Sequence, residues 1–77
     1  MQQPTILTLT FTVDGMHCAS CGILIDESIE ELDGVVSSTT SVRGRRTTVV
    51  LDPARCDPNS VLAAVADAGY TARLETP

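Results

Sequence analysis

The chain has 77 residues, of which 43% are hydrophobic, and a formal net charge of -5. This length suits one domain, and the acidic balance argues against nucleic-acid or anionic-membrane partners, whose binding depends on excess lysine and arginine. No run reaches the ~20 apolar residues of a membrane span, and residues 1–10 lack the features of a signal peptide. We therefore expect a cytoplasmic protein without direct membrane insertion, forming a single domain over residues 1–77 with its core at about 6–74.

The first part of the chain alternates between apolar and polar residues and then changes period. Residues 6–13 place every second side chain on one face, which predicts a half-buried strand. From Ser20 the apolar spacing becomes helical, and Asp33-Gly34 supplies the stop signal. The expected inner positions are Leu7, Leu9, Phe11 and Val13 on the strand and Gly22, Ile25, Ile29 and Leu32 on the helix, with Asp26, Glu27, Glu30 and Glu31 facing water.

The second part predicts a hairpin, a helix and a closing strand. Residues 35–42 form a weak strand pattern, because Ser38 and Thr40 occupy inner positions, whereas residues 47–51 form a stronger one. The turn over residues 43–46 contains Gly44, which we expect to supply a positive φ. The second helix should begin at the Asp57-Pro58 cap and stop at Gly69, before a strand over residues 70–74.

The element order is therefore strand, helix, strand, strand, helix, strand. This order is typical of the α+β ferredoxin-like βαββαβ fold, in which a four-stranded antiparallel sheet carries two helices on one face.

Cys18 and Cys21 lie where the first strand pattern ends and the helix pattern begins. A thiolate in the first turn of a helix is stabilised by unpaired N–H groups and by the helix dipole, which lower its pKa. Thiolate pairs select soft ions, and two ligands alone do not complete a tetrahedral Zn(II) site. The pair therefore predicts Cu(I), with Zn(II) as the alternative if a further ligand exists.

The remaining candidate residues are placed by the topology, by the helical spacing or by their ligand chemistry. The loop after the first strand, the hairpin and the loop after the second helix share one end, so Arg43, Arg45, Arg46 and Tyr70 should lie near the thiols. His17 is the candidate third ligand for Zn(II); otherwise it faces solvent. Ile23 and Leu24 lie off the main apolar stripe, either exposed for docking or buried against the loop. Cys56 should pack as a small hydrophobe at the opposite end.

Three segments of the sequence resemble the heavy-metal-associated domain family, which includes bacterial copper chaperones and N-terminal modules of metal-pumping P-type ATPases. They are Gly15-Met16-x-Cys18-x-x-Cys21, Leu32-Asp33-Gly34-Val35 and Ala68-Gly69-Tyr70. The resemblance implies that Cys18 and Cys21 bind Cu(I), that Met16 anchors the loop in the core, and that Tyr70 lies beside the site.

The function expected from these features is binding rather than catalysis. The leading hypothesis is a soluble metallochaperone that passes Cu(I) by ligand exchange to a copper-transporting P-type ATPase or another thiol-bearing copper protein. Such a carrier would be a monomer, or a dimer bridged by shared copper. The alternatives are a regulatory domain of a heavy-metal P-type ATPase, a Zn(II), Cd(II) or Hg(II) carrier that uses His17, and, among enzymes, a thiol-disulfide oxidoreductase.

Overall fold

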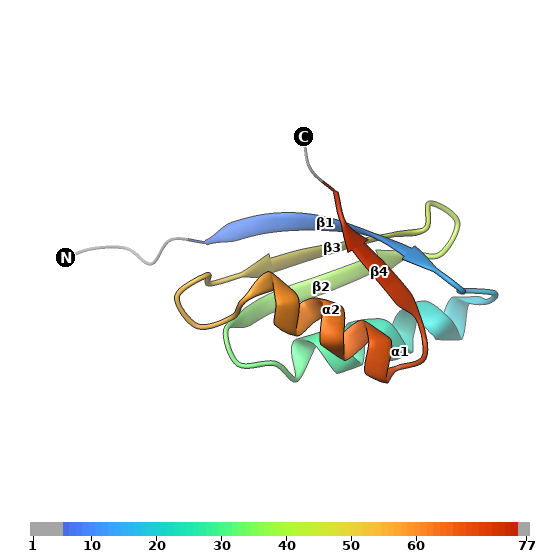
Figure 1. Ribbon diagram of the computed structural model, residues 1–77. Coiled ribbons are helices and arrows are strands. Elements are labelled where there is room, and N and C mark those ends of the chain that lie inside the picture. The colour runs from blue at the N-terminus through green and yellow to red at the C-terminus, as the bar shows by residue number, and fades with distance from the viewer. Residues whose placement is uncertain (1–5, 76–77) are drawn as a thin grey trace.

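The structure is a computed structural model that describes residues 6–75. Its elements follow the predicted order (Figure 1). They are β1 (Leu7–Asp14), α1 (Ala19–Glu30), β2 (Val35–Ser41), β3 (Arg46–Leu51), α2 (Pro58–Asp67) and β4 (Thr71–Leu74). The fold is ferredoxin-like, as predicted.

The four strands form one antiparallel sheet in the order β2-β3-β1-β4. The central strand β1 pairs with β3 from Leu7 to Thr12 and with β4 from Phe11 to Asp14. Both helices cover the same face of this sheet (Figure 1). The strands β2 and β4 are therefore its two edges.

The core lies between the sheet and the helices and is mostly aliphatic. The predicted alternation in β1 is confirmed at Phe11 and Val13, which are fully buried. Leu7 departs from it, because this first residue of the strand is 40% exposed. The other fully buried apolar side chains are Val49, Leu51, Ile25, Ile29, Val61 and Val65.

The helix ends follow the capping signals of the sequence. Cys18 is the N-cap of α1 and has an extended backbone. Beyond α1, Gly34 adopts a φ of +94° that reverses the chain. At the start of α2, the Asp57 carboxylate accepts a 2.8 Å hydrogen bond from the N–H of Asn59, and Pro58 occupies the first turn.

The expectation that Asp26 faces water is wrong. Ser38 and Thr40 do occupy inner positions of β2, and each donates a 2.7 Å hydrogen bond from its hydroxyl to Oδ1 of Asp26. The Thr40 hydroxyl also lies 2.9 Å from that of Thr47, which is fully buried. The polar residues that weakened the β2 pattern are thus satisfied by a carboxylate from the covering helix.

The expectation that Gly44 supplies a positive φ is also wrong, because Arg45 takes this conformation, with φ of 55°. The N–H of Arg45 donates to the carbonyl of Val42 at 3.3 Å, so Arg45 is the last residue of a turn that begins at Val42. The carbonyl of Arg45 then accepts a 2.9 Å hydrogen bond from the N–H of Val13. Through this hydrogen bond the hairpin is connected to β1.

Candidate metal centre

The two thiols of the loop lie side by side at one end of the sheet. Their Sγ atoms are 3.5 Å apart, which is the spacing of two free thiols rather than of a disulfide. The local backbone brings them together, because Cys18 caps α1 and its carbonyl accepts a 3.1 Å hydrogen bond from the N–H of Cys21. Cys18 is exposed and Cys21 half-buried, so both can be reached from solvent.

The pKa of Cys21 is lowered from 9.0 to about 6. The largest cause is a hydrogen bond from the side chain of Tyr70, followed by hydrogen bonds from the backbone of His17 and Cys18 and from the Cys18 thiol. The hydrogen-bond donors are therefore in the loop before α1 and on Tyr70, whereas we expected them in the first turn of α1. At neutral pH Cys21 is therefore mostly thiolate, the form that binds metal and attacks electrophiles.

Tyr70 reaches this site from the other half of the chain. It follows α2, and its N–H bonds the carbonyl of Val65 at 3.1 Å. Its ring lies over Gly15, where a Cβ atom would be 3.5 Å from Cδ1 of the tyrosine. The hydrogen bond to Cys21 raises the pKa of the Tyr70 hydroxyl, since ionisation would remove the donated proton.

Ser20 is a site residue that the sequence reasoning missed. Its hydroxyl lies 2.9 Å from Sγ of Cys18. Its place in the first turn of α1, two residues after Cys18, was the local signal that the sequence offered. Each sulfur thus has its own hydroxyl neighbour, Ser20 for Cys18 and Tyr70 for Cys21.

His17 and Met16 precede the thiols and point to different surroundings. His17 is exposed, whereas Met16 is half-buried and packs against the core. Within residues 6–75, no histidine, carboxylate or further cysteine lies close enough to the two thiols to form a metal site of three or more ligands. The donors that the structure brings together are therefore two sulfur atoms.

Two apolar side chains lie beside this loop on α1. Ile23 is 59% exposed and Leu24 is 52% exposed. Burial of both against the loop is therefore ruled out. The preceding Gly22 is buried instead, and a Cβ there would lie 3.1 Å from Val42 and 3.3 Å from Thr40. The small residue that follows the second thiol lets α1 approach β2 closely.

The arginine turn lies at the same end of the molecule as the thiol loop, as the topology predicts (Figure 1). Arg46 is nevertheless engaged elsewhere, with its Nε 3.2 Å from a carboxylate oxygen of Glu75. Glu75 also donates its N–H to the carbonyl of Thr10 at 2.9 Å, which holds this residue against β1. Residues 76 and 77 lie outside the described residues.

Cys56 lies away from the thiol loop, as predicted. It lies in the loop between β3 and α2, and its side chain is buried in the core, at 4% exposure. Burial raises the pKa of its thiol, and the nearby carboxylates of Asp57 and Asp33 raise it further. Cys56 is therefore a neutral core residue at neutral pH.

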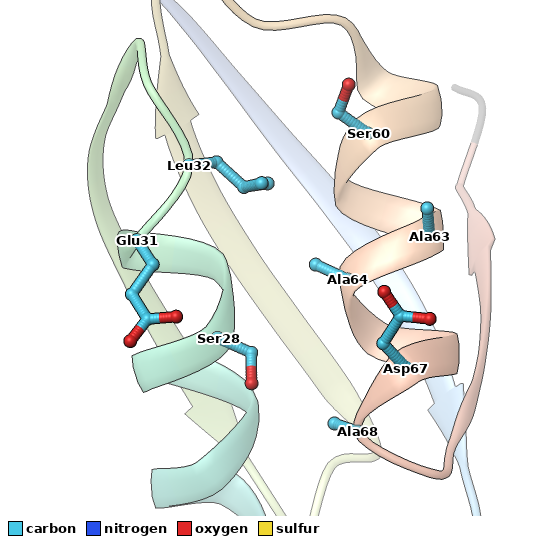
Figure 2. A pocket seen from close by; sticks show the side chains of 8 residues that line it. All are labelled: Ser28, Glu31, Leu32, Ser60, Ala63, Ala64, Asp67 and Ala68. Carbon is cyan, nitrogen blue, oxygen red and sulfur yellow. The ribbon is translucent and has the colours of Figure 1, made fainter.

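A groove lies between α1 and α2 (Figure 2). Its walls carry small side chains, and its polar groups are hydroxyls and the carboxylates of Glu31 and Asp67. None of its lining residues is a cysteine or a histidine. The soft-ligand chemistry therefore belongs to the thiol loop. The lining residues are Ser28, Glu31, Leu32, Ser60, Ala63, Ala64, Asp67 and Ala68.

No helix in residues 6–75 is both long and apolar enough to cross a bilayer.

Comparisons with known proteins agree with this geometry. A family model described as "Heavy-metal-associated domain" matches residues 10–71. The chain is 34% identical over 68 residues to the "Mercuric transport protein periplasmic component" of Salmonella typhi, covering 88% of this chain and 75% of that protein. It is 37% identical over 60 residues to "Copper-transporting ATPase 2" of Homo sapiens, covering 78% of this chain but 4% of the ATPase.

Among solved structures, the fold superposes on oxidized MerP from Ralstonia metallidurans CH34 with a TM-score of 0.89. That match is 29% identical and covers 94% of this chain and 100% of the other.

Proposed function

Because the chain belongs to the heavy-metal-associated domain family, we propose that it is a carrier of Cu(I), held by Cys18 and Cys21 and passed on by thiolate exchange. The observation that carries this proposal is the pair of accessible thiols, with Sγ atoms 3.5 Å apart and the pKa of Cys21 lowered to about 6. A pair that is already partly ionised binds a soft ion without first losing both protons.

The surroundings of the thiols suit Cu(I). This ion accepts two thiolate ligands, and the resulting complex carries one net negative charge. The groups that lower the pKa of Cys21 are neutral hydrogen-bond donors, Tyr70 foremost, and such donors also stabilise an anionic complex. The sulfur donors and the open coordination shell favour Cu(I) over Zn(II), which prefers four ligands.

Transfer is the second part of the proposal. An incoming thiol must join the copper before Cys18 or Cys21 leaves, and the exposure of Cys18 allows that approach. The exposed Ile23 and Leu24 provide an apolar surface beside the site, where a thiol-bearing partner such as a P-type ATPase would dock. The chain acts here as one non-catalytic domain, a monomer that can share copper with a second copy.

The cytoplasm is the compartment we propose for this carrier. A pair of thiols in contact with solvent remains in its ligating form where the redox poise is reducing. The same two thiols in a module of a heavy-metal P-type ATPase would have the same chemistry, so the domain could serve either as a free carrier or within such a pump.

Hg(II) is the second candidate ion. The relatives named as mercuric transport proteins favour it, since they match 88% of this chain at 34% identity. Hg(II) is also soft, and with two thiolates it forms a neutral complex, which gains less from the hydroxyl and N–H donors than an anionic copper complex does. A Zn(II) carrier would instead need His17 to turn toward the thiols.

The test is an anaerobic competition of the reduced protein for Cu(I), Hg(II) and Zn(II) against chelators of known affinity. We expect about one Cu(I) per chain, bound tightly, with weak Zn(II) binding. Cys18→Ser and Cys21→Ser should each abolish tight binding, and Cys56→Ser should leave it unchanged.

A preference for Hg(II) over Cu(I) in competition with a small dithiol would favour the mercuric candidate. Loss of Zn(II) affinity in His17→Ala would assign His17 as a ligand. Catalysed disulfide exchange without tight metal binding would support the oxidoreductase instead.

A further inference from the structure

The two edges of the sheet are protected in different ways. The edge strand β4 has only four residues and carries Arg73, and short, charged edges resist pairing with another chain. The other edge, β2, has seven residues, Val-Val-Ser-Ser-Thr-Thr-Ser, without charge, proline or glycine. Such a segment is typical of strands that pair with copies of themselves.

The free edge of β2 is occupied by carboxylates of α1. The N–H of Ser38 donates to Oε2 of Glu30 at 3.2 Å, and the N–H of Thr40 donates to Oδ2 of Asp26 at 3.2 Å. Alternate N–H groups of a strand point to the same edge, and β3 pairs with the other edge of β2. The two carboxylates therefore take the places that carbonyl groups of a fifth strand would take.

The geometry of this arrangement follows from the repeats of helix and strand. Alternate residues of a strand are about 6.6 Å apart, and residues four apart on a helix rise by about 6 Å. Asp26 and Glu30 are four residues apart on the helix, and their partners Thr40 and Ser38 are two residues apart on the strand. The helix and the strand run in opposite directions, because the later helix residue meets the earlier strand residue. The spacing of the two carboxylates on α1 is thus close to the spacing of the carbonyl groups that an antiparallel strand would offer to β2.

Asp26 is held in this position by more than one contact. Its other oxygen, Oδ1, accepts hydrogen bonds from the hydroxyls of Ser38 and Thr40, each with an oxygen–oxygen distance of 2.7 Å. The inner hydroxyls of β2 therefore orient the carboxylate that covers its outer N–H group.

We propose that Asp26 and Glu30 guard the β2 edge, and that without them this edge pairs with the β2 edge of a second copy of the chain. A self-pair of two β2 strands is antiparallel across a two-fold axis and places no like charges opposite each other, because the strand has none. The bulge between Val35 and Ser37 limits such pairing to the remainder of the strand. The role is separate from metal binding.

The test compares two charge-matched variants on the same helix. Asp26→Ala/Glu30→Ala removes the guard, whereas Glu27→Ala/Glu31→Ala removes two exposed carboxylates that make no contact with the β2 edge. Sedimentation velocity over a concentration series, with reductant and chelator present, gives the assembly state. Amide hydrogen exchange gives the protection of Ser38 and Thr40.

We expect the wild type and the control to stay monomeric and the guard variant to associate as its concentration rises. In the dilute guard variant the Ser38 and Thr40 amides should exchange at least about ten-fold faster, and association should restore their protection. A folded guard variant that stays monomeric at every concentration, or a control that associates equally, overturns the proposal.

The single variant Glu30→Ala covers the case in which the double variant does not fold. It removes the hydrogen bond between the Glu30 carboxylate and the N–H of Ser38, and it leaves all three hydrogen bonds of Asp26 in place. Faster exchange at Ser38 with concentration-dependent association supports the proposal; unchanged exchange, or faster exchange without association, contradicts it.

Discussion

Tyr70 and Cys21 lie almost fifty residues apart in the sequence, yet the tyrosine side chain makes the largest contribution to the lowered pKa of this cysteine. The contact joins the segment after α2 to the first turn of α1. The reactivity of the thiol loop therefore depends on the closing segment of the fold as well as on the loop itself.

Tyr70→Phe should raise the pKa of Cys21 back toward its usual value of 9.0, because the variant keeps the ring over Gly15 and removes only the hydroxyl. Thiolate absorbance in the ultraviolet, measured against pH with Cys21→Ser as the reference, reports this pKa. His17→Ala is the matched control, since His17 acts through its backbone and its variant should titrate like the wild type. An unchanged titration in Tyr70→Phe would show that the hydroxyl has no such role.

The metal-free protein should become more stable as the pH rises from about 6 to 9. The thiol of Cys21 has a lower pKa in the folded than in the unfolded chain, so the unfolded state binds more protons in this window. The contribution is complete above 9.0 and is lost as the pH falls through about 6. Cys56 and Tyr70, whose pKa values are raised above 9.0 and 10.0, act only above this window.

Urea denaturation of the reduced protein at several pH values measures this dependence, and Cys21→Ser should flatten it. An equally steep rise in the variant would assign the effect to other groups.

Gly34→Ala should destabilise the fold by about 3 kcal/mol. Gly34 has φ of +94°, and an added Cβ would lie 2.7 Å from Cβ of Arg55 and 2.9 Å from its carbonyl carbon. Gly69→Ala isolates the backbone part of this cost, because Gly69 has φ of +99° and nothing within 4 Å of a Cβ. That control should lose only about 1 kcal/mol. Equal losses in denaturant unfolding would show that the contact with Arg55 is relieved at little cost.

Arg45→Gly should stabilise the protein by about 0.5 kcal/mol, because glycine adopts a φ of 55° without the penalty that arginine bears. The carbonyl that bonds Val13 belongs to the backbone and is kept. Arg43→Gly makes the same change of charge at a position without positive φ and should destabilise by a similar amount. If both variants lose stability equally in denaturant unfolding, the left-handed residue bears no measurable strain.

The strand and helix order, and most core positions, could be read from the sequence because they depend on local periodicity. Phe11, Val13, Ile25 and Ile29 repeat at the spacings of their elements and are fully buried. The meeting of Tyr70 with the thiol loop followed from topology alone. These features need only the order of elements and the direction of each strand.

The contacts that were missed depend on neighbours that periodicity does not describe. Asp26 lies off the apolar stripe of α1, and helical spacing alone assigns it to water; only the position of the β2 edge reveals its partners. The turn composition favoured Gly44 for positive φ, whereas the following residue, Arg45, adopts it and accepts the hydrogen bond of Val13 through its carbonyl. The choice between copper and mercury depends on coordination energies that two cysteines alone do not encode.

The burial of Cys56 makes it an internal reporter of unfolding. An alkylating reagent at neutral pH should modify Cys21 rapidly, since its pKa is about 6, whereas Cys56 is buried with a raised pKa. In a Cys18→Ser/Cys21→Ser background, labelling of the remaining thiol requires the core to open. Its rate then reports opening of the core around Cys56, as an equilibrium population where closing is faster than alkylation and as an opening rate where alkylation is faster. Neither denaturant nor a spectroscopic probe in the core is needed.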